Sequence, residues 1–333
     1  MADGLITILD ETDRSALETQ LSAKVPTSRM INSKTLDADV TLNASDIGAT
    51  SNKNYLDNWY FANPINQRGN TIYTTHSMSI DRWIFENWNA INPTLTINDG
   101  VGITLSNNTA DGTPCSTCIR QHIENPSRFA GKTVTFSAKF TNCAITGVDG
   151  SARVLIIANG TMQSFGAVNS YSDNKIISAT CTLPESISSM SVVIGICADY
   201  GGNSSAEIGI EAAKFELGRT STLQSDSAPD FVFELTKCQR YYQKITNVYA
   251  YGHTAENVAY VALPLTVTMR KLPEYICHQC GGLYVNNTIH YPSNVYPSSI
   301  ADNCVILGVT VNGVSANTMA VLCDASIELF ADF

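Results

Sequence analysis

Several segments of this chain alternate apolar and polar residues with the two-residue period of a β-strand. Segment 133–140, TVTFSAKF, is the clearest, and its apolar positions are Val134, Phe136, Ala138 and Phe140. Because successive side chains of a strand point to opposite faces, this pattern predicts a strand with one buried face.

Two other segments are apolar at nearly every position instead of at alternate positions. Segments 152–160 and 190–198 are of this kind, and they predict strands in the middle of a sheet. Segment 207–218 alternates and then shifts its phase after Ala212, which predicts a β-bulge. Turn-forming residues separate the runs, at 98–100, 110–114, 148–151 and 200–205. Residues 51–218 are therefore predicted to form one all-β domain, a jelly-roll sandwich.

Helical spacing is found at two places. Segment 10–25 lacks Gly and Pro and carries a thin apolar stripe, so it predicts a short helix capped at Thr12 or Asp13. Such a stripe does not hold a helix alone, so copies of the chain are its expected partners. A small β element is expected to follow, before residue 50. Segment 234–244, within a polar linker at 219–245, predicts a second short helix.

Residues 246–333 are predicted to form a small C-terminal β-sandwich. Segments 261–269 and 304–311 alternate in the β manner, and the final segment 319–333 continues the pattern. Asn312-Gly313 follows the second of these runs and predicts a hairpin turn. A domain this small is expected to gain stability by packing against copies of itself.

Composition narrows the classes of partner. Only 15% of the 333 residues are charged, and the net charge of −10 argues against a nucleic-acid-binding protein. No apolar run reaches the ~18 residues of a membrane helix, so no membrane insertion is expected. The start shows no signal peptide, so synthesis in a cytoplasm is expected. Neutral glycans remain compatible, since polar and aromatic contacts bind them.

The ten cysteines are interpreted as reduced thiols, several of them in apolar strand-like runs. Two CxxC pairs, at 115–118 and 277–280, have the spacing of zinc ligands. They lie in different predicted domains, so a zinc ribbon is not expected. A local site of Cys277, Cys280, His278 and His290 stays open as an alternative, but no cofactor or metal is predicted.

All three tryptophans lie within residues 59–88. Trp59 and Trp83 have apolar neighbours and are expected in the core, whereas Trp88 stands between two asparagines and is a candidate for sugar stacking. Tyr241 and Tyr242 are expected to pack in a core or at an interface.

No catalytic motif is found: G-x-S-x-G, H-E-x-x-H and the P-loop pattern are all missing from the sequence. Paired carboxylates for glycoside cleavage stay open, because they need not be close in sequence. Calcium at the Asp-Gly turns also stays open, without the spacing of a known calcium loop.

Three motifs in order resemble those of bacteriophage tail fibres. TSRMINSKTLDADVTLNASDIGAT, at 27–50, resembles a short repeat of these fibres. LDNWYFANPINQRG and SIDRW, at 56–69 and 79–83, resemble the opening of carbohydrate-binding-module-like domains in phage receptor-binding proteins. AAKFELG and LTKCQRYYQ, at 212–218 and 235–243, resemble the segment that ends such a domain.

The resemblance implies a homotrimeric virion appendage. Its residues 1–50 would attach to a tail or baseplate protein and support trimerisation. Its distal domains would bind a bacterial surface glycan without catalysis. A capsule-degrading depolymerase or esterase, and a purely architectural virion fibre or baseplate protein, are the alternatives.

The candidate ligand-binding residues are aromatic and polar residues, mostly in two segments expected to be loops, 248–258 and 284–300. They are Trp88, Tyr249, Tyr251, His253, Tyr284, Asn286, Asn287, His290, Tyr291 and Tyr296.

Overall fold

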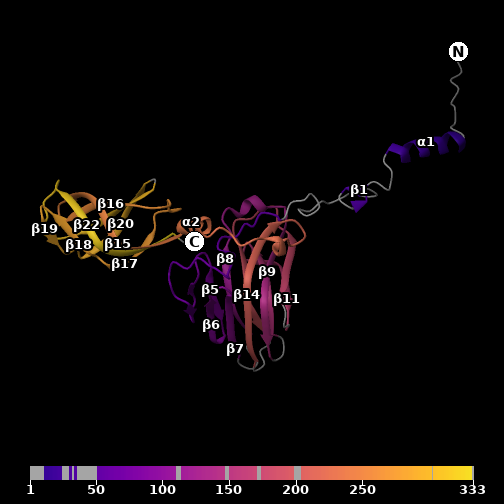
Figure 1. Cartoon of the computed structure of the whole chain (residues 1–333), viewed down its shortest axis with the longest axis horizontal. Coiled ribbons are helices and arrows are strands. Elements are labelled where there is room, and N and C mark those ends of the chain that lie inside the picture. Colours follow the sequence, from indigo (N-terminus) through magenta and orange to yellow (C-terminus); the bar gives the residue numbers. More distant parts are fainter. Residues whose placement is uncertain are drawn as a thin grey trace, which may run out of the picture. The chain divides into compact units, whose positions relative to one another are not determined.

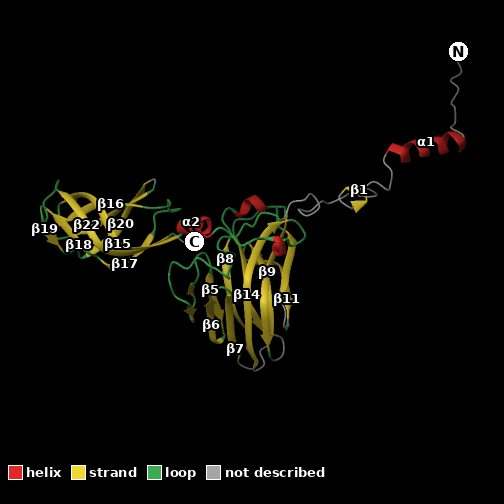
Figure 2. Cartoon of the chain, viewed as in Figure 1, coloured by secondary structure: helices red, strands yellow, loops and turns green. Residues whose placement is uncertain are grey.

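The computed structural model shows an antiparallel β protein with three large sheets and few helices (Figures 1 and 2), as predicted. The residues described are 11–24, 30–31, 34–35, 51–109, 114–146, 150–170, 174–198, 204–301 and 303–331. The chain divides into two compact units, Met1–Asn52 and Lys53–Phe333.

The first unit contains the predicted helix and a small hairpin. Helix α1 spans Glu11–Lys24, so Thr12 and Asp13 lie in its first turn and are not caps. Strands β1 (Met30–Ile31) and β2 (Lys34–Thr35) pair antiparallel. The remainder of the predicted β element, 36–50, lies outside the described residues. No helix in the described residues is long and apolar enough to cross a membrane.

Two six-stranded sheets form the central sandwich. The first has the order β11-β10-β13-β8-β5-β4 and the second β12-β9-β14-β7-β6-β3. The strands of the first are β4 (Ser77–Met78), β5 (Ile84–Trp88), β8 (Cys115–His122), β10 (Gly150–Ala158), β11 (Thr161–Val168) and β13 (Met190–Ala198). Those of the second are β3 (Ile72–Tyr73), β6 (Ile91–Asn98), β7 (Gly102–Thr109), β9 (Thr133–Ile145), β12 (Lys175–Thr182) and β14 (Ser204–Leu217).

The core of this sandwich follows the sequence pattern. The four apolar positions of β9 are fully buried, but Thr135 and Ser137 on its opposite face are buried as well, so this strand is not half-exposed as predicted. Trp83 is fully buried and Trp59 is nearly so. The register of β14 on β9 shifts on both sides of Ile210, which confirms a bulge in this strand but places it before Ala212 rather than after it. Both tryptophans expected in the core are therefore there.

The second helix starts and ends earlier than predicted. Helix α2 spans Phe231–Gln239, because the Asp230 carboxylate accepts a hydrogen bond from the Phe233 backbone N–H, 2.8 Å away. Tyr242, which the helical spacing placed in this helix, is the first residue of a strand. Short 3₁₀ helices are formed by Pro126–Phe129 and Leu223–Ser225.

The C-terminal strands form one eight-stranded sheet around one hydrophobic core. They are β15 (Tyr242–Ala255), β16 (Val258–Pro264), β17 (Glu274–Gln279), β18 (Gly282–Val285), β19 (Thr288–His290), β20 (Asn294–Ala301), β21 (Cys304–Thr310) and β22 (Met319–Phe330). The order is β19-β18-β22-β15-β16-β21-β20, and β17 pairs with the other end of β22.

Two details of this part differ from the predictions. The strand expected at 261–269 ends at Pro264, although Leu265 and Met269 beyond it are buried. Asn312-Gly313 does not close a hairpin, because β21 pairs with β16 and β20 whereas β22 pairs with β15, β17 and β18. A long-range choice of partner strand overrides the local turn signal here.

Candidate functional site

The tyrosine-rich segments predicted as loops are mostly strands, which corrects that prediction. Tyr249, Tyr251 and His253 lie on β15, and Tyr284 and Tyr296 lie on β18 and β20. The reason is physical: each alternates with small apolar residues that enter the core, and aromatic side chains favour strands.

Strand register brings three of these segments together on one face. Tyr251 of β15 is directly opposite Val321 of β22, and Val321 is directly opposite Tyr284 of β18. Tyr284 is in turn opposite Ile289 of β19. Directly opposed residues of antiparallel strands share one face of the sheet. These side chains therefore form a continuous row across four strands.

A second row runs parallel to the first. Met319 of β22, His253 of β15 and Tyr260 of β16 are successive partners, and Tyr260 is opposite Gly308 of β21. Gly308 is opposite Tyr296, and a Cβ atom at Gly308 would lie 2.4 Å from Cζ of that tyrosine ring. A larger residue at Gly308 would therefore displace the Tyr296 ring from this position.

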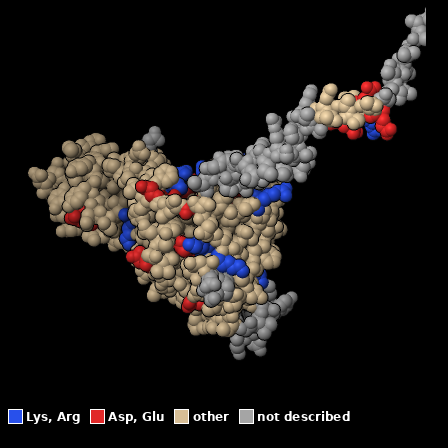
Figure 3. All heavy atoms as spheres, turned by 45° about the vertical axis from the view of Figure 1, so that its right-hand side comes forward, with Lys and Arg blue, Asp and Glu red and all other residues tan. Residues whose placement is uncertain are grey.

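We call this surface the outer tyrosine face. It consists of Tyr249, Tyr251, His253, Tyr260, Tyr284, Ile289, Tyr296, Met319 and Val321. Tyr251 is 63% exposed and Met319 is 76% exposed. None of the nine side chains carries a carboxylate, ammonium or guanidinium group. The surface is thus aromatic, accessible and nearly uncharged. Figure 3 shows few blue or red atoms on the visible side of the C-terminal part, at the left of the view.

One carboxylate lies at the margin of this face. The Tyr249 hydroxyl donates a hydrogen bond to Asp324, 3.1 Å away, and this hydrogen bond and the negative charge of Asp324 raise the pKa of Tyr249. The phenol is therefore neutral at physiological pH, and it remains a hydrogen-bonding group.

The other predicted ligand-binding residues lie outside the outer tyrosine face. Asn286 and Asn287 form the two-residue turn between β18 and β19, with φ of 51° and 62°, so the turn itself explains them. His290 ends β19 half-buried, and Tyr291 after it is 77% exposed. Trp88 is 57% exposed, but it belongs to β5 of the central sandwich rather than to the C-terminal sheet.

The cysteines are all free thiols. The Cys277 and Cys280 sulfurs lie 3.4 Å apart, and burial together with the neighbouring thiol raises the pKa of Cys277 to about 11. His278 pairs with Glu328 at 3.0 Å. In the part of the chain that the structure describes, no three His, Cys, Asp or Glu side chains gather to hold a metal ion.

The aromatic stretch 58–69 organises a junction between the central sandwich and the start of β15, a role the sequence did not reveal. The Asn58 amide donates to the backbone oxygens of Ile65 and Asp81 at 2.8 Å, and its oxygen accepts from the Ile65 N–H at 2.7 Å. The backbone N–H of Asn58 donates to Glu234 of α2 at 2.8 Å. Gln67 donates to the backbone oxygen of Tyr242 at 2.9 Å.

Two arginines cover Tyr241, which directly precedes β15, and Tyr242, the first residue of that strand. The Arg82 guanidinium lies 3.5 Å from the ring centre of Tyr241, and that of Arg68 lies 3.9 Å from the ring centre of Tyr242. Burial is the main cause that raises the pKa of Tyr241 to about 12. The expectation that both tyrosines pack in a core or interface is confirmed by their burial.

Glu124 completes this junction. The Tyr241 hydroxyl donates to it at 2.8 Å, and Arg240 lies 3.3 Å away. Burial alone would raise the pKa of Glu124, but these partners and Arg270 outweigh it and lower that pKa below 4.5.

We predict that Glu124→Gln lowers the free energy of unfolding by about 1 kcal/mol at pH 7, a value reduced for partial exposure. A carboxylate whose folded pKa is depressed stabilises the protein above its unfolded pKa, and that stabilisation is lost as the pH falls through the folded pKa. Urea unfolding from pH 7 to pH 3 should therefore show the two proteins converging below pH 4.5. A difference that persists unchanged to pH 3 would contradict the ion-pair account.

Comparisons with known proteins identify no family. No family model matches the chain, and no curated protein matches it. Among solved structures, an anti-sigma factor domain-containing protein matches with 10% identity and covers 84% of this chain and 94% of its own. Its TM-score of 0.18 is too low for any inference about fold or function.

Proposed function

We propose that this protein is a phage tail-fibre or receptor-binding protein that attaches, without catalysis, to a neutral glycan on a bacterial surface. The observation that carries the proposal is the outer tyrosine face. Five tyrosines from β15, β16, β18 and β20 lie on one exposed sheet surface, and none of its nine defining side chains carries a full charge.

The chemistry of this face suits sugars. Tyrosine rings offer flat apolar contact at a small entropic cost, and their hydroxyls provide hydrogen bonds to sugar hydroxyls. An uncharged surface loses little by desolvation when it binds a neutral ligand. The rows are held by strands, so the rings are positioned before the ligand arrives.

Attachment through such a face would be multivalent. Three consecutive apolar residues at the start of α2, Phe231, Val232 and Phe233, are exposed, and so is Leu17 of α1. Exposed apolar groups of this kind fit contacts between copies of the chain. We propose a homotrimer, in which linked weak sites gain avidity from effective concentration. A solution mass equal to one chain of 36.0 kDa would contradict it.

In this proposal the protein resides in the virion, with its N-terminal unit on a tail or baseplate protein. Labelled protein should decorate host cells, and soluble protein should compete with infection. The double substitution Tyr251→Ala with Tyr284→Ala should reduce cell binding at least about tenfold, since truncating a tyrosine at the centre of a binding surface typically costs about 1–2 kcal/mol.

Phe165→Ala is the matched control, because Phe165 is an exposed aromatic residue of β11 in the central sandwich. It should leave cell binding unchanged. Equal loss in both variants, or no loss in either, would contradict the role of the outer tyrosine face. New reducing ends or released acetate after incubation with host polysaccharide would instead identify an enzyme.

A further inference from the structure

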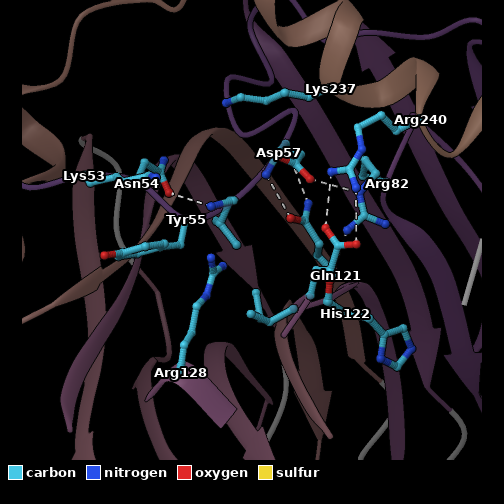
Figure 4. Close-up of a pocket in the computed structure, with 13 residues that line it drawn as sticks. Lys53, Asn54, Tyr55, Asp57, Arg82, Gln121, His122, Arg128, Lys237 and Arg240 are labelled. Carbon is cyan, nitrogen blue, oxygen red and sulfur yellow. Dashed lines mark hydrogen bonds and ion pairs between the residues drawn. The ribbon is translucent and has the colours of Figure 1, made fainter. Parts of the chain in front are cut away.

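A polar cavity lies in the central sandwich beside α2 (Figure 4), and none of its lining residues belongs to the outer tyrosine face. Its volume is about 220 Å³. Residues 53–57 and 121–124 supply most of its wall, and Arg82, Arg128, Lys237 and Arg240 complete it. Pockets for drug-sized ligands measure roughly 300–1,000 Å³, so this cavity has room for one sugar residue rather than an extended chain.

The wall is strongly cationic for an acidic protein. Five of the 20 Lys and Arg residues line it, namely Lys53, Arg82, Arg128, Lys237 and Arg240. Only two acids, Asp57 and Glu124, are among the lining residues. Burial and the charge of Arg120 lower the pKa of His122, so it is neutral at physiological pH.

Three of the five cations are bound to carboxylates. Arg82 pairs with Asp57 at 3.1 Å, Arg240 pairs with Glu124 at 3.3 Å, and Lys237 pairs with Glu234 at 2.5 Å. These pairs belong to the junction around α2 described above.

Lys53 and Arg128 differ from the other three cations because they lie beside an aromatic ring and not beside a carboxylate. Their cationic groups lie 5.3 Å and 5.0 Å from the ring centre of Tyr55, and Figure 4 shows both residues beside that ring. Among the described residues, no carboxylate lies within 4.0 Å of either. Both side chains are exposed, so solvent screens their mutual repulsion, and both are accessible to an anion bound beside the ring.

The position of the Tyr55 ring is fixed by contacts with residues of the sandwich. The Tyr55 backbone N–H donates to the Phe215 oxygen at 2.9 Å, and its ring packs edge-on against Phe129 with centres 4.9 Å apart. The neighbouring Asn54 oxygen accepts from the backbone N–H groups of Leu56 and Phe215. The ring is therefore positioned before any ligand binds, which lowers the entropic cost of binding.

We propose that this cavity binds an anionic saccharide. One face of the sugar ring would stack on Tyr55, and its carboxylate or phosphate would accept hydrogen bonds from Lys53 and Arg128. Arginine forms a two-pronged contact with either anion, and lysine acts as a point charge. The ligand class differs from the neutral glycan of the outer tyrosine face, so the inference does not depend on the proposed function.

The test uses the full chain and four probes: glucuronic acid, glucose 1-phosphate, glucose and inorganic phosphate. Calorimetric titration, with saturation-transfer NMR on the probes, should show at least one anionic sugar binding about tenfold or more tightly than glucose and inorganic phosphate. A preference for glucuronic acid would assign a carboxylate ligand, and a preference for glucose 1-phosphate a phosphate ligand.

Variants locate the site. Arg128→Met should weaken binding of the preferred sugar about tenfold or more, and Tyr55→Leu should weaken the sugar more than inorganic phosphate. Arg219→Met is the matched control, because Arg219 is an exposed arginine outside the cavity wall, and it should not alter binding. Unchanged melting temperatures would show that each variant is folded.

Four results would overturn the inference: no binding of either anionic sugar, glucose binding equally tightly, inorganic phosphate binding equally tightly, or equal affinity in Arg128→Met. The Tyr251→Ala and Tyr284→Ala double variant should bind the anionic sugar as the parent does. Loss of cell attachment with retention of this binding would therefore separate the two surfaces.

Discussion

Replacing Trp83 by alanine should lower the free energy of unfolding by about 3–5 kcal/mol, as expected when a large buried aromatic residue leaves a cavity. The Trp83 side chain is fully buried and packs edge-on against Phe61, with ring centres 5.2 Å apart. Its indole N–H donates to the backbone oxygen of Asn58 at 2.9 Å. The substitution therefore removes both apolar packing and the partner of a buried carbonyl.

The matched control is Trp88→Ala, five residues further along the chain. Trp88 is 57% exposed, and its loss should change stability by less than about 0.5 kcal/mol. Urea unfolding followed by circular dichroism measures both variants. Similar losses in the two would show that Trp83 is not a core residue.

The Asn58→Ala variant is expected to lose about 4–5 kcal/mol of stability. The side chain makes three buried hydrogen bonds, each with a net value of about 1 kcal/mol. The backbone at Asn58 has φ of 50°, a left-handed conformation that costs a residue such as alanine about 1–2 kcal/mol. The loss should also loosen α2, since the N–H of this residue donates to Glu234.

Two further variants separate the contribution of the hydrogen bonds from that of the backbone conformation. Asn58→Gly tolerates positive φ, so it reports the lost hydrogen bonds without most of the backbone strain. Asn89→Ala changes an exposed asparagine with φ of 51°, and it should cost only about 1 kcal/mol. If Asn58→Ala costs no more than Asn89→Ala, the junction network contributes nothing to stability.

The aromatic stretch 58–69 shows how far local patterns extend. Apolar neighbours of Trp59 and Trp83 predicted their burial correctly, because adjacent large apolar residues are removed from water together in a core. The same stretch gives no sign that Asn58 binds α2 or that Gln67 binds β15. Those partners are 176 and 175 residues away, and no local pattern reports a contact at that separation.

Helix α2 illustrates a boundary error with an identifiable cause. The spacing of Leu235, Cys238 and Tyr242 placed the helix at 234–244, whereas Asp230 starts it at Phe231. Asp230 follows a proline and is a good N-cap, so the signal was in the sequence. This start signal was hard to recognise because three consecutive apolar residues, Phe231, Val232 and Phe233, follow it. They do not form the one-sided apolar stripe of a helix, and all three are exposed.

The candidate site was predicted only in part. Tyr249, Tyr251, His253, Tyr284 and Tyr296 were identified by residue type, and the structure gathers them on one face. Their predicted loop setting was wrong, and Tyr260 and Met319 were missed. The alternation of Tyr249 and Tyr251 with Val248 and Ala250 was the available signal for a strand.

The sequence by itself determined the β class, the buried faces of strands such as β9, the bulge in β14 and the burial of Trp59 and Trp83. These follow from periodicity, which depends on neighbours within one element. Only the tertiary structure decided which strands pair, and hence that Tyr251, Val321 and Tyr284 form one row and that Lys53, Arg128 and Tyr55 share a cavity. Strand order and register arise from contacts between distant segments, each of which satisfies its local pattern in many alternative pairings.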